Sequence, residues 1–298
     1  MDGIRHEVFH CMGIPVHCTL IGVSEEQAAQ DLAGVHKVFR TWDSIFSRFR
    51  PDSELARLNK TTGQWNIVSP ELFHIIARCV ELSRETEGIF DASAGSHLAA
   101  AGYGLPEGYV LPATPADYRS IELDATAMRI RCAPGQILEP AGIVKGMAID
   151  AGARTIQHAK AWMINAGGDI VTKGPYPKHD WWHVAIQHPS QKDAAVAVAR
   201  IRDEAIATSG DYEVTWPTDT GGTWHHQIDM HTHRPTTGLK SVTVIAPDAQ
   251  QADTLASIAF LGGLKKGRAF LETHRVPYLF VDEADGMHMN LLFRDRLN

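Results

Sequence analysis

The chain has 298 residues, with 35 acidic and 28 basic side chains and a formal net charge of −7. Its apolar fraction of 44% and charged fraction of 21% are those of an ordinary globular protein, which argues against intrinsic disorder. The mild acidity argues against a nucleic-acid-binding protein, because such a protein normally carries a basic stripe.

The chain opens with Met-Asp-Gly-Ile-Arg-His, without the basic region and apolar core that are typical of a secretory signal. It contains no run of about 18 apolar residues, so we expect no membrane insertion. Its cysteines show no CxxC spacing, which predicts small buried side chains in a reducing compartment; they are Cys11, Cys18, Cys79 and Cys132. We therefore expect a cytoplasmic protein.

The first half of the chain predicts a hairpin followed by two helices. Alternating apolar residues over 8–21 predict paired strands that turn at Met12–Pro15. Ser24-Glu25-Glu26-Gln27 has the pattern of a capping box and predicts a helix start. Ser69-Pro70 predicts the start of a second helix, which Gly88 ends.

The second half predicts strands that alternate with a few helices. A glycine-containing loop over Pro140–Gly146 is expected to lead into a helix from Met147 to about His158. Another helix is expected over 250–261, and strands over 121–123, 128–132, 162–165, 182–187, 196–201, 205–208, 241–246 and 278–281. Frequent hairpins favour an α+β fold, with mixed, largely antiparallel sheets and packed helices. Without a repeat or a linker, we expect a single domain over residues 1–298.

Four loops combine small residues with a carboxylate: Phe90–Gly95, Glu139–Gly146, Asn165–Asp169 and Thr208–Tyr212. Glycine lets a backbone approach a ligand closely, and exposed N–H groups can cradle a phosphate. None of the loops has the GxGxxG or P-loop pattern, and each one alone is compatible with a simple turn. Together they favour a pocket of nucleotide size.

Sixteen histidines are an unusually high number, and four of them cluster at His225, His226, His231 and His233. The spacing suggests a metal site, but the neighbouring residues are typical of a loop rather than a helix. A zinc site needs three or four rigidly held ligands. The alternative is a polar surface loop with one functional histidine.

Asp253 and Ser257 are four residues apart at the start of an expected helix, so they share one face. Two oxygens on one face could help to hold a hard cation, although Mg²⁺ needs further oxygen ligands. The alternative is that the acidic residue complements the helix dipole.

Motifs that occur in one order over Phe9–Leu264 extend this interpretation. They are Met12–Pro15, Phe46–Glu54 with Leu58-Asn59, Phe90–Gly95 with Gly102–Gly104, Gly142–Asp150, Asn165–Asp169, Thr208–Tyr212, His226–His233, and Ser241–Val244 with Ala252-Asp253. In this order they resemble the ApbE family of flavin transferases, also called FAD:protein FMN transferases. The resemblance implies an ApbE-like architecture related to the T-fold.

The resemblance also implies a reaction that depends on Mg²⁺. The family splits FAD at its pyrophosphate and moves FMN onto a Thr or Ser hydroxyl of a target flavoprotein, with release of AMP. Some members instead hydrolyse FAD to FMN and AMP. A third alternative is a non-catalytic FAD-binding protein, because the segment His226–His233 departs from the family pattern HxIDPxTG.

Site residues follow from the same resemblance. Mg²⁺ would be held by Asp253, Ser257 and the backbone carbonyl of Gly142. FAD would be contacted by Met12, Phe49, Phe90, Asp91, Glu139, Lys145, Gly167, Gly168 and Thr208. His226 is expected nearest the attacking hydroxyl, because a neutral imidazole is a competent base near pH 7. Asp229 would orient His226 or lie just outside the metal's own ligands.

The chain departs from the family pattern at several positions. His233 stands where the family has Gly, and Met230 where it has Pro. Ala92 replaces a Pro, and Ala101 replaces the Trp of the WGFG motif. Ser257 replaces a Thr, which keeps a hydroxyl but loosens its rotamer.

Overall fold

The structure is a computed structural model, and it describes residues 3–47, 50–103, 112, 114–177, 179–212, 215–217, 223–230 and 232–298. Its contacts divide the chain into two compact units, which are interleaved in sequence. The first unit holds residues 1–41, 145–212 and 237–298, and the second holds 42–144 and 213–236. The single domain expected for residues 1–298 stays a prediction. Within the described part of the chain, no helix is both long and apolar enough to cross a membrane.

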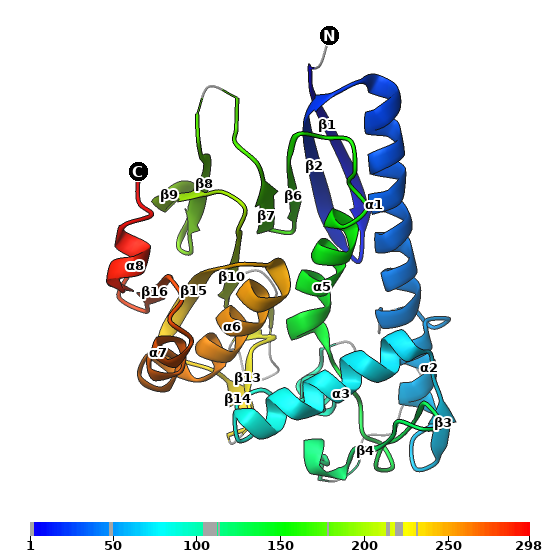
Figure 1. Cartoon of the computed structure of the whole chain (residues 1–298). Coiled ribbons are helices and arrows are strands. Elements are labelled where there is room, and N and C mark those ends of the chain that lie inside the picture. Colours follow the sequence, from blue (N-terminus) through cyan, green and yellow to red (C-terminus); the bar gives the residue numbers. More distant parts are fainter. Residues whose placement is uncertain are drawn as a thin grey trace. The chain divides into compact units, whose positions relative to one another are not determined.

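The first unit is built on an antiparallel sheet (Figure 1). Its strand order is β1-β2-β6-β7-β10-β15-β16-β17. The strands are β1 (Gly3–Cys11), β2 (Ile14–Val23), β6 (Ala161–Ala166), β7 (Asp169–Lys173), β10 (Ala205–Gly210), β15 (Leu239–Ala246), β16 (Tyr278–Asp282) and β17 (Met287–Met289). The hairpin expected at the start of the chain is confirmed, with its turn at Met12-Gly13.

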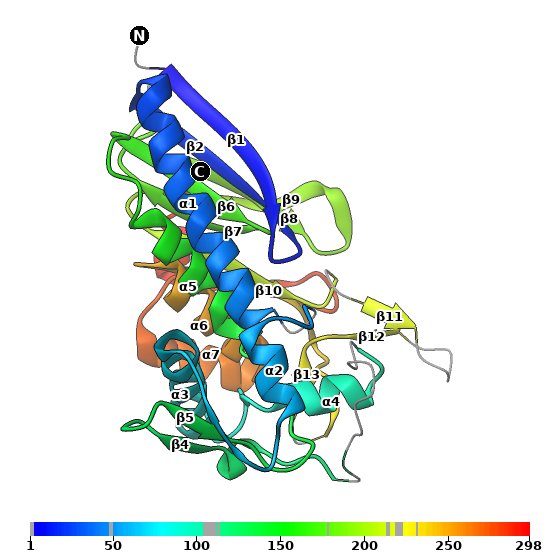
Figure 2. The same cartoon turned by 90° about the vertical axis from the view of Figure 1, so that its right-hand side faces the viewer.

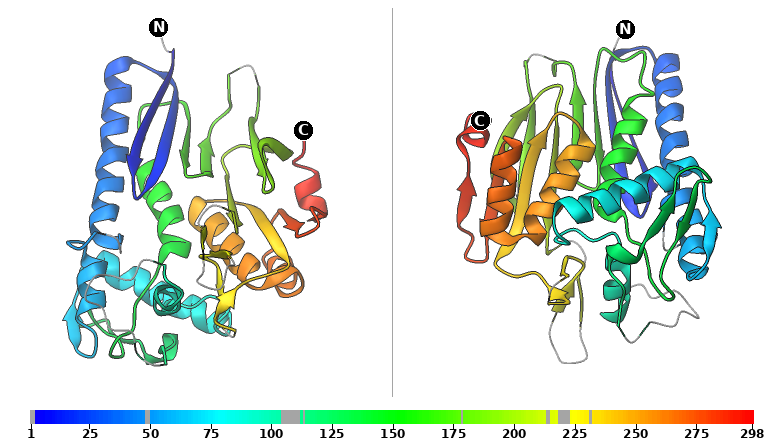
Figure 3. Two further views of the ribbon diagram at one scale, coloured as in Figure 1. Left: turned by 180° about the vertical axis from the view of Figure 1, so that it is seen from behind. Right: turned by 60° about the horizontal axis from the view of Figure 1, so that its bottom comes forward.

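Helices cover one face of this sheet, as Figure 3 shows for α6 and α7. The helices of this layer are α1 (Glu25–Phe46), α5 (Ala141–Ala153), α6 (Ala249–Leu261) and α7 (Gly263–His274). The capping box at the start of α1 is confirmed, because Ser24 and Gln27 exchange hydrogen bonds between side chain and backbone. Phe39 of α1 lies edge-on to Phe9 of β1, which attaches the helix to the edge of the sheet.

A buried carboxylate, Asp31 of α1, holds the segment that follows α5. It accepts hydrogen bonds from the backbone N–H groups of Gln157, His158 and Ala159, and from the His158 ring. Burial raises the pKa of Asp31, but these hydrogen bonds outweigh it and hold the pKa below its ordinary value. The ionised carboxylate therefore stabilises this part of the fold.

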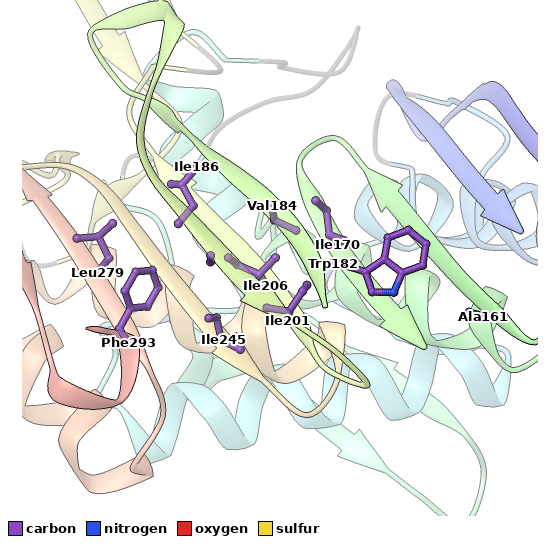
Figure 4. Close-up of a cluster of buried hydrophobic side chains, with 11 residues drawn as sticks. Ala161, Ile170, Trp182, Val184, Ile186, Ile201, Ile206, Ile245, Leu279 and Phe293 are labelled. Carbon is purple, nitrogen blue, oxygen red and sulfur yellow. The ribbon is translucent and has the colours of Figure 1, made fainter. Parts of the chain in front are cut away.

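A second hairpin and a short helix cover part of the other face (Figure 4). They are β8 (Trp182–His188), β9 (Gln191–Ile201) and α8 (Leu291–Arg294). Trp182, Ile201 and Phe293 are buried here together with Ile206 and Leu279 of the sheet. The sheet is thus buried between two layers along β6 to β16.

The second unit contains helices and small sheets (Figure 2). They are α2 (Glu54–Lys60), α3 (Pro70–Glu85), α4 (Ala94–Ala100), η1 (Tyr118–Ser120), the sheet of β3 (Trp65–Ile67), β5 (Arg129–Arg131) and β4 (Glu122–Asp124), and the hairpins β11 (Thr215–Pro217) with β12 (Thr223–His225) and β13 (Ile228–Asp229) with β14 (Arg234–Pro235). Ser69 caps α3 as expected, and the helix ends at Glu85, ahead of Gly88.

The loop expected over Pro140–Gly146 is wrong, because α5 begins at Ala141 and ends at Ala153. The glycine in its middle has a packing role. A Cβ on Gly146 would lie 2.5 Å from the carbonyl oxygen of Ala249, so glycine lets α5 approach the start of α6 closely. Glycine thus serves helix packing here rather than a turn.

Candidate functional site

Two tight turns lie together at one end of the large sheet. Met12 and Gly13 join β1 to β2, and Gly167 and Gly168 join β6 to β7; all four have positive φ angles. Such a conformation is typical of two-residue hairpins. The Gly167 N–H donates to the carbonyl of Pro15 over 3.0 Å, which holds the two turns side by side. The structure therefore brings together three of the predicted flavin contacts, Met12, Gly167 and Gly168.

A buried ion pair lies directly after the second turn. The Lys145 Nζ is 2.9 Å from Asp169 Oδ2, and Asp169 is 1% exposed. Burial raises the pKa of the Asp169 carboxyl above its ordinary value, and Lys145 opposes that effect. The Thr208 N–H approaches the other carboxylate oxygen at 3.4 Å. Asp169 thus holds the ammonium of Lys145 beside the glycine turn and close to Thr208.

The predicted metal residues of α6 are both buried on one face of that helix. Asp253 and Ser257 are each 5% exposed. Asp253 Oδ2 accepts the N–H of Gly146 over 3.0 Å, although an N–H inside a helix ordinarily donates to the carbonyl four residues earlier, here Gly142. The Ser257 hydroxyl shares a hydrogen bond of 3.1 Å with Ser209 of β10. The Asp253 carboxylate therefore faces α5, and the Ser257 hydroxyl, one turn later, faces β10.

The N-terminus of α6 is fixed by a residue of α5. The carboxylate of Asp150 accepts the backbone N–H groups of Ala249 and Gln250 at 3.0 and 2.9 Å. These are N–H groups that lack partners within their own helix. Asp150 and the close contact at Gly146 together set the register of α5 against α6, and hence of Lys145 relative to Asp253.

In the second unit, the predicted contacts Phe90 and Asp91 are buried ahead of α4. The Asp91 carboxylate accepts hydrogen bonds from the backbone and hydroxyl of Ser93 at 2.7 and 2.6 Å, and from the Tyr118 N–H at 3.3 Å. Burial raises the pKa of Asp91 despite these bonds. Asp91 thus shapes the turn internally, and its contact with flavin stays a prediction.

Glu139 lies at the start of α5 and accepts the Ala141 N–H over 3.2 Å. A carboxylate at a helix N-terminus is stabilised by the helix dipole. The preceding residue, Leu138, exchanges two hydrogen bonds with the buried side chain of Asn59, at 2.9 and 3.1 Å. The Leu58-Asn59 motif therefore positions Glu139, and Gly142 follows it in the first turn of the helix.

The two adjacent histidines have different surroundings. His225 Nε2 donates to the carbonyl of Thr236 over 3.0 Å, and His225 Nδ1 accepts the Gln227 N–H. Both of its ring nitrogens thus hold the loop closed. The Gln227 amide nitrogen lies 3.2 Å from His226 Nε2, and an amide nitrogen can only donate, so His226 Nε2 accepts here and carries a lone pair. Of this pair, the imidazole suited to accept a proton is that of His226.

Asp229 ends β13, and its carbonyl accepts the His233 N–H over 2.8 Å across the turn to β14. His233 has a φ of 55° in this turn. Its ring stacks on His97 of α4 with centroids 4.4 Å apart. The position at which the family pattern has Gly is therefore occupied by a histidine in a conformation that glycine adopts readily.

An indole lies against the segment where the WGFG motif would begin. Trp216 of β11 donates its Nε1–H to the carbonyl of Ala101 over 2.7 Å and stacks on Tyr103 with centroids 4.8 Å apart. The Trp that Ala101 replaces is thus matched by an indole from a distant segment. The sequence gives little indication of this contact, because no spacing pattern links Trp216 of β11 to the motif.

The predicted site residues divide between the two units. Those of the first unit are Met12, Lys145, Gly167, Gly168, Thr208, Asp253 and Ser257, and those of the second are Phe90, Asp91, Glu139, Gly142, His226 and Asp229. Phe49 lies outside the described residues. Sequence reasoning assigned no role to Asp169 and Ser209, although both lie inside quoted motifs. Their signal is a polar side chain within a motif of small residues.

The donor set at α6 fits a hard cation. Among the residues that the structure describes, no three His, Cys, Asp or Glu side chains are grouped so as to hold a metal ion. Asp253 and Ser257 instead offer a carboxylate and a hydroxyl, which are ligands that Mg²⁺ accepts together with phosphate oxygens and water. The part played by the Gly142 carbonyl stays a prediction.

Comparisons with known proteins identify the family of the chain. The ApbE family model matches residues 12–280. A Haemophilus influenzae protein named FAD:protein FMN transferase is 27% identical over 84% of this chain and 78% of its own length. A Chlamydia trachomatis protein of the same name is 30% identical over 75% of this chain and 73% of its own length.

Solved structures show the same fold. The ApbE protein of Thermotoga maritima superimposes with a TM-score of 0.87 at 23% identity, and 99% of each chain is covered. The flavin transferase ApbE of Vibrio cholerae gives a TM-score of 0.84 at 24% identity over 100% of both chains. These likenesses bear out the α+β fold. Because the family model spans most of the chain, the protein belongs to the ApbE family.

Proposed function

We propose that this protein is an FAD:protein FMN transferase, which moves FMN from FAD to a Thr or Ser hydroxyl of a target flavoprotein and releases AMP. Family membership and the names of its relatives support the flavin chemistry. The observation that carries the proposal is the Lys145–Asp169 pair beside the Gly167-Gly168 turn. The protein has a net charge of −7, so an anionic dinucleotide needs a local positive charge, which Lys145 supplies beside the turn.

Lys145 and the glycine turn are proposed to bind the pyrophosphate of FAD. The Lys145 side chain is 26% exposed, whereas its partner Asp169 is buried, so the lysine is the member of the pair that a ligand can reach. A Cβ built on Gly168 would meet nothing within 4 Å, so the backbone of this turn is open to a ligand. The N–H groups of Gly167 and Gly168 donate to the Pro15 carbonyl and to Asn165 Oδ1, so the turn would contribute room for a close approach and Lys145 the positive charge.

Asp253 and Ser257 are proposed to hold Mg²⁺, with the carbonyl of Gly142 as a further ligand. When bound, the cation would neutralise charge on the pyrophosphate and orient it. Ser209 keeps the Ser257 hydroxyl in one orientation through their hydrogen bond. That bond compensates for the methyl group that a Thr would use to restrict its rotamer.

His226 is proposed to take the proton of the attacking hydroxyl. Its Nε2 accepts a hydrogen bond from the Gln227 amide, and the incoming hydroxyl would replace that donor. As the proton moves to Nε2, the hydroxyl oxygen forms a bond to the FMN phosphorus. The bond between that phosphorus and the bridging oxygen breaks, and AMP leaves with the bridging oxygen. Asp229 is proposed to orient His226 or to lie just outside the metal's ligands. The cytoplasmic location of enzyme and acceptor stays a prediction.

AMP release tests these assignments. Purified protein is incubated with FAD, Mg²⁺ and a candidate acceptor domain, and AMP is quantified by chromatography. We expect Asp253→Asn to lower the rate by roughly 10²-fold and His226→Ala by about 10²- to 10⁴-fold. Asp193→Asn on exposed β9 is the matched control and should match the wild type.

The same mixture separates the alternatives. FMN and AMP released at the same rate without an acceptor would indicate an FAD pyrophosphatase, with water as the nucleophile. Tight FAD binding without AMP under any divalent cation would indicate a binding protein, and it would refute both enzymatic functions.

A further inference from the structure

The turn between β13 and β14 contains a histidine in a backbone conformation that L-residues rarely adopt. His233 has a φ of 55°. A side chain in the left-handed region is unfavourable unless its surroundings compensate, and glycine has no such penalty. The hydrogen bond of the His233 N–H to the Asp229 carbonyl and the contacts of its side chain therefore compensate for this conformation.

His97 provides that contact. The two imidazole rings lie 4.4 Å apart and only 8° from parallel, and His97 is buried on α4. Burial, together with the neighbouring ring of His233, lowers the pKa of His97 to about 4. His97 is therefore neutral near pH 7, and a charged pair does not push the rings apart. We call His97 and His233 the imidazole pair.

The ring of His97 rests on a rigid support. A Cβ on Gly95 would lie 2.7 Å from Ile137 Cγ2, so α4 packs there without space to spare. The Ser96 hydroxyl accepts the Ile137 N–H over 2.7 Å. Helix α4 also contacts β13. The imidazole pair thus connects a fixed helix to the turn.

The turn between β13 and β14 is attached to the segment that carries His226. The Asp229 carbonyl accepts the His233 N–H over 2.8 Å at one end of this segment. At the other end, the Thr236 carbonyl accepts a hydrogen bond from the His225 ring, and the Thr236 N–H donates to the Gln227 carbonyl. His226 directly precedes β13, which pairs with β14 at Ile228–Pro235 and Asp229–Arg234, so a change at His233 would reach His226 through this hairpin.

We propose that His97 and His233 are positioning residues, which hold the turn that carries Asp229 and thereby fix the imidazole of His226 for proton transfer. The proposal rests on the proposed function of His226 as the base. Neither member of the imidazole pair touches a reacting atom in this account. A base displaced by about 1 Å can lose roughly 10²-fold in rate, so such positioning has a measurable effect.

Three variants and one control test the proposal. His97→Leu removes the aromatic ring but keeps a buried side chain, and His97→Phe restores a flat ring. His233→Gly removes the partner ring and suits the positive φ of the backbone, so it should fold. His74→Leu on the exposed side of α3 is the matched control.

We expect His97→Leu and His233→Gly to lower kcat for AMP release by about 10-fold or more, with the KM for FAD within about twofold of wild type. His97→Phe should recover most of that loss, and His74→Leu should behave as wild type. Unchanged kcat in folded His97→Leu and His233→Gly, or a loss confined to KM, would overturn the proposal.

A second measurement does not depend on activity. Imidazole ¹⁵N resonances of His226 report its environment in each variant. We expect them to shift in His97→Leu and to return in His97→Phe. If the wild type releases no AMP but this pattern is seen, the proposed function fails and the positioning role stands. If the His226 resonances stay at their wild-type positions in both His97→Leu and His233→Gly, the positioning role is refuted.

Discussion

Replacement of Lys145 by Met tests the buried ion pair most severely. Met keeps the length of the side chain and removes its charge, so Asp169 is left as a carboxylate that is 1% exposed without its cation. Removing one partner of a buried pair costs about 3 kcal/mol or more, because the remaining charge has lost both water and its counterion. For a chain of 298 residues, a loss of about 3 kcal/mol lowers Tm by roughly 5 °C.

The pH dependence of this loss has a definite sign. Burial already raises the pKa of Asp169, and removal of Lys145 raises it further. A carboxyl with a raised pKa in the folded state binds protons more tightly there than in the unfolded chain, so its contribution to stability falls as the pH rises. The destabilisation by Lys145→Met should therefore be largest at alkaline pH and shrink as the pH falls toward the ordinary range of Asp.

Thermal unfolding of Lys145→Met, Asp169→Asn and the double variant between pH 5 and pH 9 measures the effect. The double variant should recover much of the loss, because neither charge then remains buried. Lys173→Met, whose ammonium pairs with Asp203 on the surface, is the control and should change Tm little. If Lys145→Met unfolds like this control at every pH, or if the two single losses simply add in the double variant, the reasoning about the pair is wrong.

Three further substitutions probe contacts that hold the site in place. Asp31→Asn should lower the free energy of unfolding by about 2 kcal/mol near neutral pH. Because the pKa of Asp31 is lowered in the folded state, the stabilisation by the wild-type carboxylate should be complete above about pH 5 and disappear as the pH falls through the folded-state pKa. Acid unfolding monitored by circular dichroism measures this. Asn59→Ala should cost about 2 kcal/mol in urea unfolding, because it leaves two buried backbone groups unpaired, and an unchanged midpoint would contradict this role. Gly146→Ala should lower the free energy of unfolding by about 2 kcal/mol or more, because the new Cβ clashes with the Ala249 carbonyl. Gly3→Ala is the control and should be close to neutral, because a Cβ there meets nothing within 4 Å. Equal melting temperatures for the two variants would count against the close helix contact.

Elements with strong local signals were predictable from the sequence. The first hairpin, the capped starts of α1 and α3 and the helix α6 follow from alternation, caps and apolar spacing. Helix α7 begins at Gly263, and only Gly262 separates it from the end of α6 at Leu261. It was missed because no loop marks this boundary, although Leu264, Phe270 and Leu271 give it an apolar face. Its close contact with α6 depends on Gly267, because a Cβ there would lie 2.1 Å from the Ala259 carbonyl oxygen.

Helix α4 shows the same limit in the second unit. Its residues are mostly small, so the sequence shows no apolar periodicity that would distinguish a helix from a loop. The helix is stabilised by tertiary packing at Gly95 and by the hydrogen bond to Ser96. Local propensity cannot reveal such contacts, because the partner, Ile137, is distant in sequence.

Within the site, the sequence identified residue types better than partners. Asp253 and Ser257 were expected on one helix face, and the structure places them there. The bond between Ser257 and Ser209 and the pair formed by Lys145 and Asp169 join strands and helices far apart in sequence, so no spacing rule could predict them. His233 was noted only as a departure from a glycine pattern, and its ring contact with His97 became visible in three dimensions.

The most direct test of flavin transfer follows two products in one reaction. Wild-type protein is mixed with FAD, Mg²⁺ and an acceptor flavoprotein, and AMP and the intact mass of the acceptor are recorded over the same time course. We expect one covalent FMN on the acceptor for each AMP released, with both lost in Asp253→Asn and when the acceptor hydroxyl is removed. AMP without covalent flavin, or no AMP with any acceptor and divalent cation, would contradict it.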